Sequence, residues 1–103
     1  MEFYKNLYIG DSIRKPNKVK RKLKRHAKQL KIYVIILSPG TDQLEIFHSI
    51  LLGQPFYKKK ENLPYIVGIA GNYDEAVELV CRIVNDAMAK NGNADLKNYI
   101  QGV

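Results

Sequence analysis

The sequence contains no tryptophan and only one cysteine, Cys81. A lone cysteine cannot form a disulfide within the chain, and it excludes a metal site built on a cluster of cysteines. Cys81 falls at the edge of the apolar side of the helix that we expect around it. We therefore interpret it as a small packing residue rather than a reactive thiol.

Long apolar runs are also missing. No stretch approaches the ~20 apolar residues of a membrane span, and the N-terminus has no basic segment followed by an apolar one, as a signal peptide would. We therefore expect a soluble, cytoplasmic protein with no membrane partner. Apolar residues still make up 46% of the 103 positions. This content is enough for an ordered core, and the length indicates a single domain over residues 1–103.

Acidic residues are missing from one long part of the chain. None lies between Asp11 and Asp42, whereas ten of the 17 lysines and arginines lie within positions 14–31. The last third carries acids instead, among them Asp74, Glu75 and Glu78. The formal net charge of +7 is thus unevenly distributed, a property that concerns partners more than the fold.

Apolar patterning predicts the strands. Phe3–Ile9 alternates but has a mixed second face, which is typical of a peripheral strand. Lys31–Leu37 is apolar on both faces, which predicts a central strand, and so is the β-branched run Tyr65–Ala70. Leu44–Phe47 fits either a helix or a short strand. We favour a strand paired with the preceding one, followed by a helical turn or an irregular passage through Ser49–Pro55.

Two main helices are expected, over Asn17–Leu30 and Tyr73–Lys90. The first carries an apolar stripe about 100° wide, in which we place His26. The second begins at a capping signal, Asn72 followed three residues later by Glu75. Its apolar residues fill an arc of about 200°, so we expect it to contact the core on more than one side.

The order of these elements, with a short C-terminal helix over Asp95–Ile100, predicts an α/β fold; α+β is the alternative. We expect one compact domain with a mixed sheet of three or four strands and at least one right-handed βαβ crossover. Two arrangements stay open. Helices on opposite faces would let a monomer cover its own sheet, whereas helices on one face would leave an apolar surface and favour a homodimer.

The basic helix is the main candidate site. Lysines and arginines displace condensed counterions from nucleic acid, so we predict that its outward residues contact nucleic acid, or another polyanion, without sequence specificity. The alternative is a protein-interaction or self-associating protein in which this face is only solvated. The residues expected to make the contacts are Lys18, Lys20, Arg21, Lys24, Arg25 and Lys28.

Other chemistry has little support in the sequence. The turn Gly68–Asn72 lies where α/β proteins often bind phosphate, but it lacks the spacing and the lysine of a P-loop, so we interpret it as a capped helix start. His26 and His48 fit no metal-binding spacing and are interpreted as structural. Serines occur without a nucleophile elbow. We expect a non-catalytic protein with no cofactor, no metal and no identified small-molecule ligand.

Three segments resemble small bacterial proteins to which no function is assigned. They are Tyr65–Val80, with the sequence YIVGIAGNYDEAVELV, Gln43–Phe47 and Gln54–Lys58. The residues that carry the resemblance are those of packing and helix capping. It implies a compact bacterial cytoplasmic domain and no particular activity or site.

Overall fold

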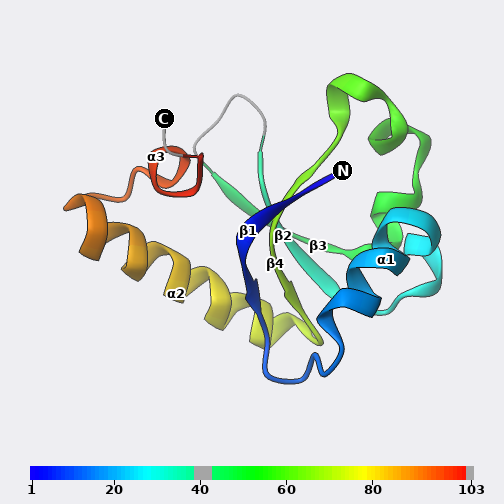
Figure 1. The fold of residues 1–103 in the computed structure, drawn as a ribbon, viewed down its shortest axis with the longest axis horizontal. Coiled ribbons are helices and arrows are strands. Elements are labelled where there is room, and N and C mark those ends of the chain that lie inside the picture. Colours follow the sequence, from blue (N-terminus) through cyan, green and yellow to red (C-terminus); the bar gives the residue numbers. More distant parts are fainter. Residues whose placement is uncertain (39–42, 102–103) are drawn as a thin grey trace.

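The computed structural model describes residues 1–38 and 43–101 of the chain (Figure 1). The described residues form a four-stranded mixed sheet in the order β1-β4-β2-β3. Its strands are β1 (Glu2–Ile9), β2 (Tyr33–Leu37), β3 (Leu44–His48) and β4 (Tyr65–Ala70). The predicted mixed α/β domain is therefore confirmed, with the expected peripheral β1 and central β2.

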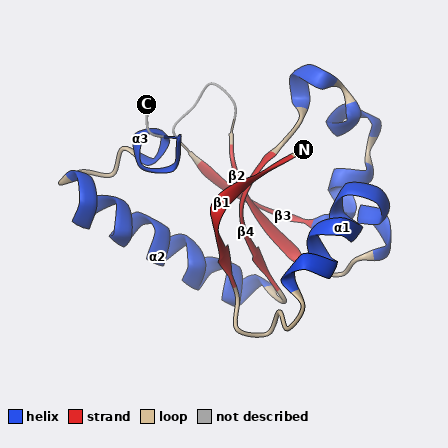
Figure 2. Ribbon diagram, viewed as in Figure 1, coloured by secondary structure: helices blue, strands red, loops and turns tan. Residues whose placement is uncertain are grey.

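Helices cover both faces of the sheet. Figure 2 shows α1 and the 3-10 turns on one side of the strands, with α2 and α3 on the other. The prediction of a strand followed by a helical turn or an irregular passage is confirmed by β3 and the 3-10 turns after it, so the passage is helical. The elements are α1 (Pro16–His26), η1 (Ala27–Gln29), η2 (Ser49–Gly53), η3 (Pro55–Lys58), η4 (Lys60–Asn62), α2 (Tyr73–Asn91) and α3 (Leu96–Gln101).

The predicted crossover between parallel strands does not join consecutive strands but β1 and β4. β1 and β2 flank β4, which pairs parallel with β1 and antiparallel with β2. The chain reaches β4 only after α1, the β2–β3 hairpin and the 3-10 turns. Because β3 occupies the outer edge of β2, the inner edge is left for β4.

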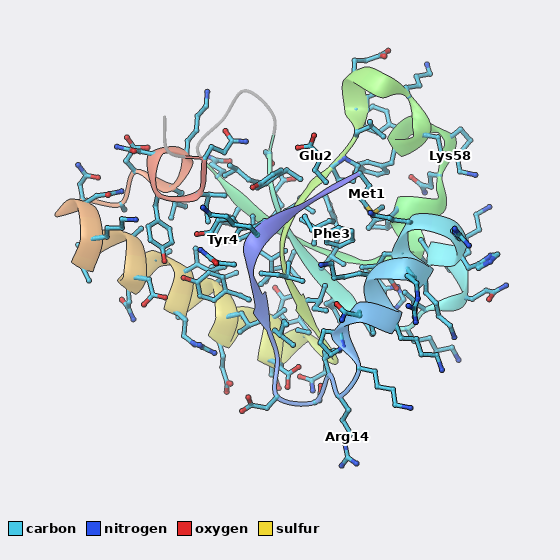
Figure 3. The ribbon with its side chains drawn as sticks, in the orientation of Figure 1. Met1, Glu2, Phe3, Tyr4, Arg14 and Lys58 are labelled. Carbon is cyan, nitrogen blue, oxygen red and sulfur yellow. The ribbon has the colours of Figure 1, made fainter. Side chains whose placement is uncertain are left out.

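The sheet separates two apolar clusters. In β1, Phe3 and Leu7 pack toward α1, whereas Tyr4 and Tyr8 pack toward α2, and Figure 3 shows Phe3 and Tyr4 on opposite sides of the strand. Both faces of the sheet are covered, which is the arrangement that requires no second chain. The α1 side buries Leu23, Ala27, Val34, Ile36, Leu52, Ile66 and Ile69, and the α2 side buries Ile35, Leu37, Val67, Ala70, Leu79 and Ile83 among others.

The predicted position of His26 in the apolar stripe is wrong. Leu23 and Ala27 are buried as expected, but His26 is exposed. The α-helix ends at His26, whose backbone has left the helical region at φ −139° and ψ 45°. The following turn is a 3-10 helix, so a count at 3.6 residues per turn no longer applies.

α2 contacts the core on one side only. Leu79 and Ile83 are buried, but Val77 and Met88 remain 39% and 50% exposed. Cys81 is also exposed, so it does not act as a packing residue. The prediction of core contacts on more than one side, made from the 200° arc of apolar residues, is wrong. Among the described residues, the sheet and α3 are the elements that cover this helix.

Gly92 ends α2 in the left-handed conformation, with φ +75°, and donates its N–H to the carbonyl of Met88. A methyl group at this position would meet no atom within 4 Å. Gly92→Ala should therefore lower the free energy of unfolding by about 1 kcal/mol through backbone strain alone.

Urea denaturation would measure this loss, and Gly92→Asn is the matched control because asparagine tolerates the left-handed region better. Equal stability of the alanine variant and the parent would contradict the prediction.

Candidate nucleic-acid interface

The basic helix α1 has little local stabilisation of its own. No side chain caps its N-terminus, and its first turn contains no acidic residue. Lys24, Arg25 and His26 in the last turn are favourable for the helix dipole, but repeated like charges along the helix oppose folding. Burial of Leu23, followed by Ala27 in η1, holds α1 on the sheet.

Two of the six predicted contact residues lie over an aromatic ring of β1. The Nζ atoms of Lys20 and Lys24 are 5.3 Å and 5.5 Å from the centroid of Phe3. Such cation–π contacts contribute about 0.5–1 kcal/mol at exposed sites. Lys20 is half-buried there rather than fully outward, so its charge lies close to the start of β1.

Three of the predicted residues, Lys24, Arg25 and Lys28, line a groove between the C-terminal half of α1 and the 3-10 turns. Its volume is about 530 Å³. Lys58 of η3 adds a fourth cation from the opposite wall, and Figure 3 shows it across from α1. Within residues 1–38 and 43–101, no Asp or Glu lines this groove. Its charge is therefore uniformly positive.

The remaining predicted residues lie outside the groove. Lys18 and Arg21 are exposed on α1 but line no part of it. Arg14 projects from the loop before α1, away from the groove (Figure 3). The predicted set is thus one basic helix surface, of which the C-terminal part faces this groove.

Sequence reasoning missed Lys58 and Tyr57, which both line the groove. A signal for them was present, since a run of three lysines, 58–60, directly follows Phe56 and Tyr57. Aromatic residues beside lysines are common in nucleic-acid sites. What local patterning could not show is that η3 lies opposite α1.

Ser49 ties the two sides of the groove together. Its Oγ donates to the Leu30 carbonyl at 2.8 Å and accepts the Ile32 N–H at 3.3 Å, and its own N–H donates to the Ile32 carbonyl at 2.9 Å. Ser49 is fully buried. These bonds fix the start of η2 against the segment that follows α1. On the groove wall, the stem of Lys28 occupies the space that a side chain at Gly53 would take.

The turn between β4 and α2 is filled by the protein's own carboxylate. Glu75 accepts hydrogen bonds from the Gly71 N–H at 2.8 Å and from the Ser12 N–H and Oγ at 3.1 Å and 2.8 Å. Asn72 Oδ1 in turn accepts the Glu75 N–H at 2.9 Å. The interpretation of this turn as a capped helix start is confirmed. Glu75 occupies the place where a phosphate would otherwise bind.

The two histidines differ. His48 is half-buried, accepts the Ile50 N–H through Nδ1 at 3.2 Å, and packs edge-on against Tyr33 with ring centroids 5.2 Å apart. Its structural role is confirmed. His26 has no such setting and instead lines the basic groove. Within the described ranges, no three His, Cys, Asp or Glu side chains are placed to hold a metal ion.

A polar cluster links β1, α2 and α3 on the far side of the sheet. The Tyr8 hydroxyl donates to Asp86 Oδ2 at 2.6 Å and lies 2.8 Å from the Tyr99 hydroxyl. Burial, and then the hydrogen bond to Asp86, raises the pKa of Tyr8 far above its ordinary value. Tyr8 therefore stays protonated and acts as a donor that positions the two helices against β1.

Comparison with protein-family models, with curated proteins and with solved structures finds no match to this chain. The resemblance to small bacterial proteins therefore stays a prediction. Across the described residues, no helix has both the length and the apolar character needed to cross a membrane.

The Glu75 contacts predict a pH-dependent stability. The hydrogen bond from Gly71 is the largest cause that lowers the pKa of Glu75 below its ordinary value of 4.5; partial burial opposes it, and Ser12 adds to it. A carboxyl with a lowered pKa stabilises the fold above its unfolded pKa, and this stabilisation disappears as pH falls through the folded value. Glu75→Gln should therefore lower the free energy of unfolding by about 1 kcal/mol at neutral pH.

The difference from the parent should shrink toward zero in acid, as urea denaturation at a series of pH values would show. Glu78→Gln, an exposed change on the same helix, is the control and should show no such loss. A Glu75→Gln deficit that is the same at every pH would contradict this account.

Proposed function

We propose that this chain is a small non-catalytic module that binds nucleic acid, or another polyanion, through the basic surface of α1. The observation that carries the proposal is the groove in which Lys24 and Arg25 of α1, Lys28 of η1 and Lys58 of η3 meet, with no acidic lining residue in the described chain. Positive charge gathered in a concave site attracts phosphate more strongly than the same charge spread over a convex surface.

A second observation favours an extended anion over a single one. A neighbouring cavity of about 740 Å³, lined by Phe3, Lys20 and Lys24 among others, shares Lys24 and Met1 with the groove. The two cavities therefore adjoin and together form a mainly basic track from the start of β1 to η3, in which Glu2 is an acidic residue of the second cavity. A track of this kind suits a phosphate backbone, whose charges repeat along its length. The proposal places the protein in the cytoplasm.

A specific feature of α2 favours the alternative function, self-association. Tyr73, Val77 and Met88 are 54%, 39% and 50% exposed, and at 3.6 residues per turn they fall within about 60° of arc. A stripe of exposed apolar residues on a helix is typical of a protein interface. The homodimer proposed on this basis uses the outer side of α2, since the sheet itself is covered.

Binding can be tested by fluorescence anisotropy with a labelled duplex and a labelled single strand at about 50 mM salt. The logarithm of the association constant should fall with log salt by about 0.9 for each phosphate contact on duplex DNA and about 0.7 on a single strand. Lys24→Glu/Lys28→Glu should abolish most of the binding, because it reverses two of the four groove charges.

Lys90→Glu is the matched control for Lys28→Glu alone, since each reverses one exposed charge and Lys90 lies on α2, across the sheet. Failure of both oligonucleotides to bind the parent protein at low salt would remove the proposal. An equal loss with Lys90→Glu would show that only net charge matters.

Sedimentation equilibrium in the micromolar range tests the alternative. A dimer through α2 should dissociate in Val77→Glu, which places a charge in the stripe. Ala89→Glu should leave it intact, because that exposed position lies about 100° farther around the helix than Met88. A mass of one chain at all concentrations would exclude this interface.

A further inference from the structure

The groove combines a cationic rim with an apolar floor. Below the charged rim of Lys24, Arg25, Lys28 and Lys58, its floor is apolar. The floor includes the buried side chains of Leu23, Ala27 and Leu52, and its sides include Met1, Tyr57 and Leu63. Leu23, Ala27 and Leu52 belong to the apolar cluster of the α1 side, so the groove reaches the edge of the core and offers an apolar surface beneath its cationic rim.

Tyr57 lines the groove beside Lys58, and its ring is held on two sides. Its centroid lies 6.1 Å from that of Phe47, at a tilt of 59°, and 5.0 Å from that of Phe56, at 87°. Tyr57 is half-buried and packs on the α1-side cluster. A ring fixed in this way loses little conformational freedom on binding, which favours its use as a stacking surface.

We infer that the groove receives one unstacked base of a single-stranded nucleic acid, with the adjoining phosphates on its cationic rim. The inference rests on the proposed function and specifies its ligand. A volume of about 530 Å³ lies within the range of about 300–1,000 Å³ typical of small-ligand sites. Bases in a duplex are paired and stacked, whereas those of a single strand can turn outward onto an aromatic side chain.

Charge and apolarity together select this ligand. An acidic peptide would satisfy the rim, but its carboxylates and any apolar group that could fill the floor lie on different residues. A nucleotide has a flat base and a charged phosphate within one unit. The single strand is therefore the occupant that fits both parts of the groove.

The test uses the full chain and compares a labelled single strand with a duplex of the same sequence. Tyr57→Ala should weaken single-strand binding by roughly tenfold and leave duplex binding unchanged. Tyr57→Phe keeps the ring and should bind as the parent does. Tyr73→Ala removes an exposed aromatic residue on α2 and should also bind normally.

A second measurement does not depend on the folding of the Tyr57→Ala variant. Because the chain has no tryptophan, Leu63→Trp would place a single reporter at the groove, where Leu63 is 42% exposed. Its emission should be quenched when single strand binds and should stay unchanged with duplex.

The possible failures are distinguishable. Equal affinity for single strand and duplex, with no effect of Tyr57→Ala and no change in tryptophan emission, would overturn the base pocket while leaving the polyanion proposal standing. Competition by polyglutamate as effective as that of the unlabelled single strand would also overturn it. Absence of all nucleic-acid binding would remove both proposals together.

Discussion

The structure depends on one constraint, which is that the two inner strands are apolar on both faces. β2 and β4 bury nearly every side chain they carry, so neither face of the sheet can remain open to water. At about 25 cal/mol for each Å² of apolar surface removed from water, covering both faces provides the main stabilisation. α2 and α3 cover one face, and α1 with the 3-10 turns covers the other (Figure 1).

This constraint explains how so basic a helix folds against the protein. α1 lacks a side-chain cap and carries repulsive charge pairs, yet Leu23 and Ala27 must close the face that contains Val34 and Ile36. The charges are then displayed on the outer surface of a firmly docked element. α1 is too short to cover the whole face, and η2 to η4 complete it, with Leu52 buried beside Leu23. The groove lies where these two coverings meet.

The opposite end of the fold shows the contrasting use of charge. At the start of α2, Glu75 satisfies the backbone N–H groups of Gly71 and Ser12, and Gly10 and Gly71 leave the room that this carboxylate and the Ser12 hydroxyl occupy. The N-terminal end of this helix is thus neutralised from within. The start of α2 is thus occupied by Glu75, whereas the basic groove is lined by four cations.

Local sequence determined the elements and their caps. The alternation in β1, the two apolar faces of β2, the Asn72–Glu75 cap and the glycine end of α2 each depend on residues a few positions apart, so periodicity and side-chain chemistry suffice to predict them. The excess of cations on α1 is likewise a property of the sequence itself. The predicted contact residues Lys24, Arg25 and Lys28 were found in this way.

Only tertiary structure decided which elements meet. The insertion of β4 between β1 and β2, the exposure of Val77 and Met88, and the meeting of Lys58 and Tyr57 with α1 all join residues far apart in the chain. Their positions follow from how three α-helices and the 3-10 turns share the area of one sheet. No window of neighbouring residues contains that information, because burial is a competition among all the elements for the same apolar surface.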